Sequence, residues 1–367
     1  MRARVACLLL LCAAAFAADS SRLEAIFAPQ ADAKSPGLAV LIRKGDQTLF
    51  ERGYGVRDLR SKAPIDARTD FRLASCTKQF TAMAVMLLVH DGKLRYDEPV
   101  TEVFPQFPAY GRAITIRHLL THTSGIPDYE DLMDGGPWTA ERQIRDDEVL
   151  TLLERQKQAK FAPGTSWSYS NSGYVLLGLI VGKTSGVPFG EFLRRRIFVP
   201  LGMEHTLIYV KGRNTVPNRA FGHNKGAGGF VEADQSSTSA TQGDGGIYSN
   251  LEDLAKWDRA LQKYTLLGET EMRPSLTPVR LADGSQPRWP QTPGDDNLNP
   301  GQPVNYGFGW FVDLFAGRQR MWHWGSTRGF STAIERFPSE KLTIVVLCNR
   351  TDLEAPKLAL EAADLLR

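Results

Sequence analysis

The stretch Ser75-Cys-Thr-Lys-Gln-Phe-Thr-Ala-Met-Ala-Val-Met-Leu-Leu88 joins a serine and a lysine, three positions apart, to an apolar run. Apolar residues recur along it at the spacing of one helical face, and Asp91-Gly92 closes it, which predicts a helix. Residues three apart on a helix face the same side, so we expect the Lys78 amine beside the Ser75 hydroxyl. A serine hydroxyl becomes a nucleophile when an adjacent base removes its proton, and a buried lysine can be that base. The alternative is a helix start with a solvated lysine, since about one isolated Ser-x-x-Lys is expected by chance in such a chain.

Strand-like runs lie at both ends of the chain, and helical patterns lie between them. Residues 37–43 and 47–53 flank a Gly45-Asp46 turn and predict a hairpin. Late strands are expected over residues 306–312, 332–337 and 342–348, and a final helix over 355–366. Interior helices are expected at residues 116–120, 147–153, 174–181, 189–197 and 251–261. Residues 211–242 and 277–303 are rich in turn-forming and polar residues, which predicts two long surface loops.

This order of elements predicts an α/β (α+β) fold in which both ends of the chain build one lobe and a helical lobe is inserted. We place the α/β lobe at about residues 18–85 and 240–367, and the all-helical lobe at about residues 86–239. A cleft between two lobes is a common place for a small-molecule site.

Residues 1–17 have the pattern of a secretory signal peptide. Arg2 and Arg4 precede an apolar run over residues 5–14, and Ala15-Phe-Ala17 supplies the small-x-small pattern of a cleavage site. We therefore expect cleavage near Ala17 and a periplasmic or secreted mature protein over residues 18–367. A retained anchor is the alternative. No other segment approaches the ~20 apolar residues of a spanning helix, so no membrane span is expected in the mature chain.

The composition is that of a globular protein and narrows the list of partners. Of 367 residues, 42% are hydrophobic, which excludes disorder. The 44 basic and 41 acidic residues give a net charge of +3, and removing Arg2 and Arg4 with the signal leaves 42 against 41, or +1. Without a basic patch, no nucleic-acid partner is expected. Of the four cysteines, Cys76 and Cys348 remain after cleavage. We expect both to be buried thiols, and a disulfide between them is the alternative.

A second candidate motif is Tyr169-Ser-Asn171, which precedes an apolar helical run. A tyrosine beside a lysine can shuttle protons, and an asparagine amide can both donate to and accept from a substrate amide. The alternative is that Asn171 only caps the following helix. Tyr248-Ser-Asn250 has the same pattern and also precedes a helix, so the pattern alone does not separate the two.

The third candidate motif is His323-Trp-Gly-Ser326, followed by Arg328. A glycine beside an edge strand lets a substrate backbone approach closely, and the next N–H can donate to an oxyanion. A single buried histidine is more often structural than catalytic, so His323 has weight only together with its neighbours. Arg328 suits a substrate carboxylate, and the alternative is a surface arginine.

Taken in order, Ser75-x-x-Lys78, Tyr169-x-Asn171 and His323-x-Gly325 resemble the catalytic motifs of the penicillin-recognising serine hydrolases. The chain looks most like the branch holding class C β-lactamases, serine D,D-carboxypeptidases, D-aminopeptidases and related esterases. Further family-like segments are residues 117–126, 163–171, 245–249 and 306–310. The resemblance covers essentially all of residues 18–367. It implies a β-lactamase-like fold with a mostly antiparallel sheet flanked by helices.

The resemblance also implies a role for each matching residue. Ser75 would be the acylated nucleophile, and Lys78 and Tyr169 would share the general acid and base roles. Asn171 would hold the substrate, and the N–H groups of Ser75 and Ser326 would form an oxyanion hole. An exported hydrolase of this kind would act on a D-alanyl peptide, a β-lactam or a small ester or amide. No metal and no cofactor are expected.

The third motif departs from the β-lactamase pattern. Class C β-lactamases usually carry Lys-Thr-Gly there, where this chain has His323-Trp-Gly325. Histidine at this place is closer to certain D,D-peptidases and D-aminopeptidases, so efficient β-lactam turnover is not expected. Trp324 replaces a small hydroxyl residue and would crowd the site or favour a different acyl group.

Two other readings remain open at this point. His118 and His122 are four apart, as in a helical zinc pair, although the glutamate of His-Glu-x-x-His is replaced by Leu119. The chain could also be a catalytically silent homologue that binds peptidoglycan or a partner. The α/β-hydrolase mechanism is disfavoured because no Gly-x-Ser-x-Gly occurs in the chain.

Overall fold

The computed structural model describes residues 19–291 and 299–367. The signal peptide expected over residues 1–17 lies outside the described residues. Within them, the only cysteines are Cys76 and Cys348, and both are buried free thiols, as expected from the sequence.

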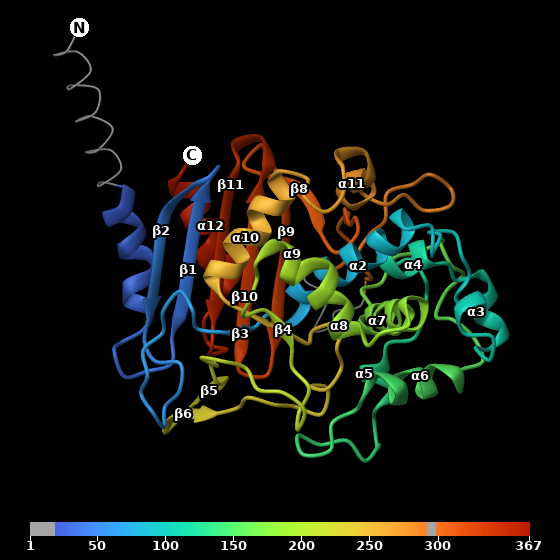
Figure 1. The fold of residues 1–367 in the computed structure, drawn as a ribbon, viewed down its shortest axis with the longest axis horizontal. Helices are drawn as coiled ribbons and strands as arrows, with labels where there is room; N and C mark the ends of the chain where they lie inside the picture. The colour runs from blue at the N-terminus through green and yellow to red at the C-terminus, as the bar shows by residue number, and fades with distance from the viewer. Residues whose placement is uncertain (1–18, 292–298) are drawn as a thin grey trace, which may run out of the picture.

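Six antiparallel strands form the central sheet, in the spatial order β2-β1-β11-β10-β9-β8 (Figure 1). Their bounds are β1 Leu38–Lys44, β2 Gln47–Tyr54, β8 Phe311–Phe315, β9 Arg318–Thr327, β10 Phe330–Phe337 and β11 Leu342–Cys348. Strand β1 pairs with β11, with Val40 opposite Val346, so the two ends of the chain meet in the middle of the sheet. The expectation of a mostly antiparallel sheet flanked by helices is confirmed.

Both faces of the sheet are buried, because successive residues of a strand point to opposite sides. On β1, Val40 and Ile42 join the core beneath α12 (Ala355–Leu365) and the helical residues 19–27. Ala39 and Leu41 join the larger core on the other face, which α2 (Lys78–His90) and α10 (Leu251–Gln262) cover (Figure 1). The sheet is therefore the middle of three layers.

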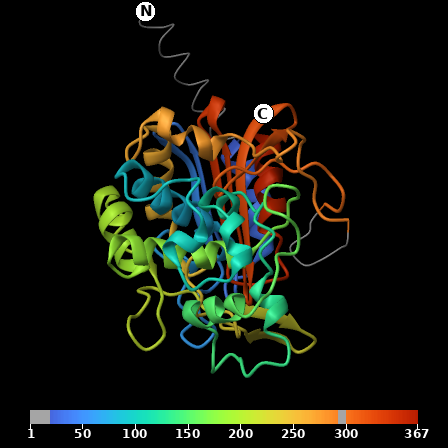
Figure 2. The same ribbon diagram turned by 90° about the vertical axis from the view of Figure 1, so that its right-hand side faces the viewer.

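A group of helices packs beside the sheet on its β8–β9 side (Figures 1 and 2). They are α3 Val100–Val103, α4 Ile116–Leu120, α5 Tyr129–Leu132, α6 Asp146–Glu154, α7 Asn171–Ser185, α8 Phe189–Leu193 and α9 Val199–Leu201, and α11 (Glu269–Leu276) comes later in the chain. In the described part of the chain, no single helix is long and apolar enough to cross a membrane, while α7 with residues 189–201, bent by 73°, passes that test as a pair.

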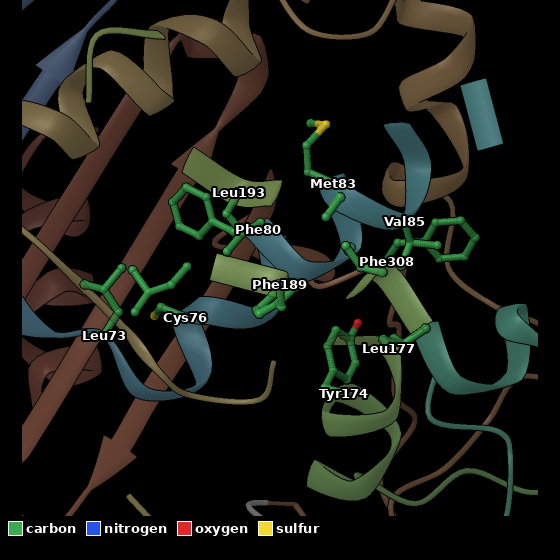
Figure 3. Packing of buried hydrophobic residues seen from close by; sticks show 14 of the residues in the cluster. Leu73, Cys76, Phe80, Met83, Val85, Tyr174, Leu177, Phe189, Leu193 and Phe308 are labelled. Carbon is green, nitrogen blue, oxygen red and sulfur yellow. The ribbon is translucent and has the colours of Figure 1, made fainter. Parts of the chain in front are cut away.

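Helix α2 runs through the centre of the larger core. Every residue from Lys78 to Leu88 is buried, and Phe80 stacks on Trp257 of α10 at 4.4 Å between ring centroids. Figure 3 shows Cys76 and Phe80 on one side of the packed cluster and Tyr174 and Leu177 of α7 on the other. Burial of side chains of this size contributes about 1.5–3 kcal/mol each, so the start of α2 is held rigidly.

The strand expected over residues 306–312 is largely wrong, because β8 begins only at Phe311. Gly309 adopts φ +75°, and a Cβ there would lie 2.7 Å from the Lys78 carbonyl oxygen, so the backbone turns against α2 instead of extending. The expected loop over residues 211–242 also contains a hairpin, β5 (His223–Gly226) and β6 (Gly229–Glu232). A small sheet, ordered β3-β7-β4, joins Phe71–Arg72, Ile247–Ser249 and Leu207–Ile208.

Candidate active site

Ser75 lies in a strained turn between β3 and α2. The turn is a short 3₁₀ helix over Ala74–Thr77, and Ala74 adopts the left-handed conformation at φ +47°. That conformation costs a non-glycine residue about 1–2 kcal/mol, so the surroundings must hold it. Thr332 of β10 does so by donating its hydroxyl to the Leu73 carbonyl oxygen at 2.9 Å. The serine is thereby presented at a fixed place beside the sheet.

Lys78 is fully buried, and its Nζ lies 3.0 Å from the Ser75 Oγ. The same nitrogen lies 2.8 Å from the Asn171 Oδ1 and 3.0 Å from the Asp244 carbonyl oxygen. The proximity of Lys78 to Ser75 that the three-residue spacing predicts is present. A hydroxyl, an amide oxygen and a carbonyl oxygen therefore surround one amine.

Asn171 does not cap α7, as the alternative interpretation supposed. Ser170 is the N-cap, since its hydroxyl accepts from the Gly173 N–H at 3.2 Å, and this frees the Asn171 side chain to reach Lys78. Asp128 accepts from the Asn171 backbone N–H at 2.6 Å and so fixes the start of the helix. The helix-capping role holds instead for the second copy of the motif, Tyr248-Ser-Asn250.

In that second copy, Asn250 caps α10 by accepting from the Asp253 N–H at 3.0 Å. The Tyr248 hydroxyl accepts from Arg219 at 3.0 Å. Both contacts are structural and involve neither Ser75 nor Lys78. The fold thus separates two motifs that are identical in sequence.

Tyr169 lies against Lys78 and is 9% exposed. The Lys78 Nζ is 4.8 Å from the centre of the Tyr169 ring, within the range of a cation–π contact. Two further rings pack on Tyr169: His122 at 4.4 Å and Trp324 at 5.9 Å between centroids. The three catalytic candidates Ser75, Lys78 and Tyr169 therefore belong to one cluster.

His323 is fully buried behind the cleft, although the sequence suggested that it binds substrate. Its Nδ1 lies 2.6 Å from the Trp324 carbonyl oxygen and its Nε2 lies 3.2 Å from the Tyr306 hydroxyl. A carbonyl can only accept, so Nδ1 carries the proton and Tyr306 donates to Nε2. Burial lowers the pKa of His323 to about 3, which keeps the ring neutral.

The missing side chain of Gly325 lets another segment of the chain pack closely against β9. A Cβ at this position would lie 2.2 Å from the Leu73 carbonyl oxygen and 2.4 Å from the Thr332 Oγ1. The sequence suggested that this glycine admits a substrate backbone at an edge strand, but the backbone that it admits is the segment leading to Ser75. Gly325 therefore sets how closely β9 approaches the serine.

The end of β9 has a free edge toward the cleft. Strand β8 pairs with β9 only as far as Trp322, so residues 323–327 extend beyond it. Trp324, Ser326 and Thr327 line the cleft there. Arg328 is exposed in the turn between β9 and β10, directly after Thr327 of the cleft lining, and its carboxylate-binding role stays a prediction.

A cleft with an empty volume of about 740 Å³, partly open to solvent, adjoins Ser75. Its lining comes from several segments: Arg72, Ala74, Ser75, Tyr129, Glu130, Asn171, Thr238, Thr241, Asp244, Gly245, Trp324, Ser326 and Thr327. Arg72 and Glu130 bring a buried cation and an exposed carboxylate to this wall, and sequence reasoning missed both. The position of Arg72, three residues before Ser75, was the one available signal.

The two histidines of the zinc alternative are not a helical pair. Helix α4 ends at Leu120, and His122 adopts φ +59°, so His122 does not sit one turn above His118. The Nδ1 of His118 accepts from the Thr115 N–H, and that of His122 accepts from the Ser170 N–H. Among the described residues, no group of three or more His, Cys, Asp or Glu side chains has the geometry of a metal site.

Comparison with known proteins agrees with this arrangement. A family model described as Beta-lactamase matches residues 23–367. The chain belongs to the β-lactamase family. Its members include the penicillin-recognising serine hydrolases that the three motifs resemble.

The chain is similar to several named proteins of this family. The chain is 32% identical over 344 residues to "Penicillin-binding protein 4*" of Bacillus subtilis, covering 89% of this chain and 71% of that protein. It is 30% identical over 336 residues to "D-aminopeptidase" of Gluconobacter oxydans, covering 90% of this chain but only 59% of the relative. The crystal structure of a penicillin binding protein from Bacillus halodurans superposes with a TM-score of 0.73 at 28% identity, covering 90% of this chain and 95% of that one.

Proposed function

We propose that this protein is a serine hydrolase that forms an acyl-enzyme on Ser75 and cleaves amides or peptides of D-amino acids. The observation that carries the proposal is the 3.0 Å contact between the Ser75 Oγ and the Nζ of fully buried Lys78. Burial disfavours an ammonium relative to a neutral amine, and a neutral amine is the form that can accept a proton.

The three contacts of the Lys78 Nζ match the hydrogen-bonding groups of a neutral amine. A neutral amine has two N–H donors and one lone pair. The donors match the Asn171 Oδ1 and the Asp244 carbonyl oxygen, which leaves the lone pair for the Ser75 hydroxyl. The three contacts therefore orient the lone pair at the proton that has to leave.

In the first step, the Ser75 Oγ attacks the substrate carbonyl carbon and its proton passes to the Lys78 Nζ. The C–N bond then breaks, and the leaving amine takes a proton from Lys78 or Tyr169, whose ring lies 4.8 Å from Nζ. The backbone N–H groups of Ser75 and Ser326 stabilise the oxyanion. Water then attacks the ester carbonyl, and the proton it loses returns to the Ser75 oxygen.

The substrate class rests on the cleft and on one relative. The Gluconobacter relative named D-aminopeptidase supports a substrate with a D-residue. Glu130 lines the cleft with an exposed carboxylate, which suits the ammonium of a substrate with a free α-amine. Trp324 also lines the cleft, at the position where β-lactamases carry a small hydroxyl residue, so we expect slow turnover of β-lactams. The signal-like residues 1–17 support the further proposal that the enzyme acts in the periplasm or is secreted.

The test uses paired D- and L-alanine p-nitroanilides with the mature protein, Ser75→Ala and Ser326→Ala. The proposal uses the hydroxyl of Ser75 but only the backbone N–H of Ser326, so Ser326→Ala is the matched control. We expect hydrolysis of the D-substrate, its loss in Ser75→Ala, and its retention in Ser326→Ala. Full activity of Ser75→Ala would refute the acyl-enzyme. Ser75 labelling by a penicillin without turnover of any amide or ester would instead favour the silent homologue.

A further inference from the structure

His122 holds both residues that flank Tyr169. Its backbone carbonyl oxygen accepts from the Ser168 N–H at 3.0 Å. Its side chain accepts from the Ser170 N–H through Nδ1, at 3.1 Å. One residue thus bonds to the chain on each side of the tyrosine, which restrains the tyrosine backbone at both ends.

The imidazole of His122 also packs directly on the Tyr169 ring. Their centroids are 4.4 Å apart with a tilt of 32°. Three other rings close around the imidazole: Tyr306 at 4.6 Å, Tyr174 at 5.2 Å and Trp167 at 5.7 Å. His122 is 1% exposed, so it contacts the Tyr169 ring from within the core and leaves the substrate to other residues.

The protonation state of His122 fits the role of an acceptor. Burial lowers the pKa of His122 well below its usual 6.5. The ring is therefore neutral, and because Nδ1 accepts from Ser170, the proton is on Nε2.

A histidine at this position destabilises the folded state. Its Nε2 is buried and has no hydrogen-bond partner within the described parts of the chain, and such a group costs about 1–3 kcal/mol. Its left-handed φ of +59° adds further strain. Strain and unmet hydrogen bonds that persist beside a reactive group are characteristic of functional sites.

We propose that His122 is a positioning residue that holds Tyr169 in its productive place relative to Lys78 and Ser75. The Nδ1 bond to Ser170 and the ring contact fix the tyrosine, while His122 itself exchanges no proton with the substrate. The proposal rests on the proposed function, since it requires Tyr169 to carry a proton in that reaction.

The test is a double-mutant cycle on kcat and KM with His122→Phe, Tyr169→Phe and the double variant. His122→Phe keeps a ring but removes the acceptor for Ser170. We expect kcat to fall at least about tenfold with little change in KM, because misplacement of a reacting group by ~1 Å can cost 100-fold. In the Tyr169→Phe background, His122→Phe should have no further effect on kcat, because its action passes through the tyrosine.

His118→Phe is the matched control, since His118 also accepts one backbone N–H through Nδ1, from Thr115 at 3.2 Å. We expect this control to keep its kcat. His122→Asn, which offers an acceptor and tolerates left-handed φ, should recover most of the activity lost in His122→Phe. Thermal melts show which variants are folded, and His122→Ala replaces His122→Phe in the cycle if the latter does not fold.

Three results would overturn the proposal. They are additive losses in the cycle, a kcat within twofold of the wild type in folded His122→Phe, and an Asn variant no more active than the Phe variant. Full activity of Tyr169→Phe would refute the assigned role of Tyr169 instead. The failure of this inference is therefore distinguishable from the failure of the proposed function.

Discussion

Substitution of Gly325 by alanine tests how closely β9 must approach the segment before Ser75. The new Cβ would lie 2.2 Å from the Leu73 carbonyl oxygen, where ordinary contact begins at 3.4 Å. The new contact would be about 1.2 Å shorter than an ordinary contact, and neither the Leu73 segment nor β9 can move away easily. Leu73 is held by the Thr332 hydroxyl and Gly325 lies within the sheet, opposite Thr332 in β10.

The turn at Ala74 would therefore shift relative to the Ser326 N–H by about 1 Å. A displacement of that size at a reacting group costs about 100-fold, so we expect kcat/KM to fall by about that factor. Overpacking of this kind also destabilises by about 1–3 kcal/mol, which urea unfolding measures. The rate should be recorded far below the unfolding midpoint, so that loss of folded protein does not contribute.

Gly228→Ala is the control, because a Cβ at that glycine meets nothing within 4 Å. It should leave both stability and activity nearly unchanged. A folded Gly325→Ala enzyme with kcat/KM within threefold of the wild type would refute the reasoning, because β9 and the serine turn would then not need their present spacing.

Three further predictions concern other groups. Because the pKa of His323 is lowered to about 3, the unfolded chain binds one more proton than the folded chain between about pH 6.5 and 3, and stability falls as pH falls through that window. Wild type should lose about 1.4 kcal/mol per pH unit more than His323→Asn, measured by urea unfolding between about pH 6 and 4. Burial raises the pKa of Cys76 to about 12 and also raises that of Cys348, so neither thiol should react with Ellman's reagent until the protein unfolds. Glu130→Gln should lower kcat/KM about fivefold for D-alanine p-nitroanilide, while the N-acetylated substrate should be unaffected.

Each of these predictions has a clear contrary outcome. Equal pH slopes for wild type and His323→Asn would show that the imidazole is not held neutral by the fold. Rapid labelling of either cysteine in folded protein would contradict its burial. Equal effects of Glu130→Gln on both substrates would assign the residue to packing or to Asn171, whose Nδ2 lies 3.4 Å from its carboxylate.

Local patterns predicted much of the fold and the core of the site. The hairpin of β1 and β2 follows from two strand-like runs around a Gly45-Asp46 turn, and both strands lie within a residue of their expected bounds. The contact between Ser75 and Lys78 follows from helical spacing alone, because the residues share one turn of chain. These predictions needed no knowledge of distant segments.

Other features depend on contacts between distant segments and could not be read from the sequence. Asn171 and Asn250 end identical Tyr-Ser-Asn motifs, which the pattern alone does not separate. The family resemblance selected Tyr169-x-Asn171, and the contact of Asn171 with Lys78 supplies the physical reason. The role of Gly325 depends on Leu73, some 250 positions earlier in the chain.

The strand expected over residues 306–312 failed for the same reason. Its apolar residues suit a strand, but Gly309 has to turn where it meets the backbone of α2. Tertiary packing overrides local preference at such places.

Rapid-quench mass spectrometry tests the central claim most directly, because an acyl-enzyme is a covalent species. D-Alanine p-nitrophenyl ester is mixed with enzyme, the reaction is stopped with acid before the first turnover ends, and the digested protein is mapped. The account predicts a D-alanyl group on the peptide that carries Ser75, released on a chase without substrate and absent from Ser75→Ala. Product formation at the normal rate with no adduct on Ser75, or with the adduct on another residue, would contradict it.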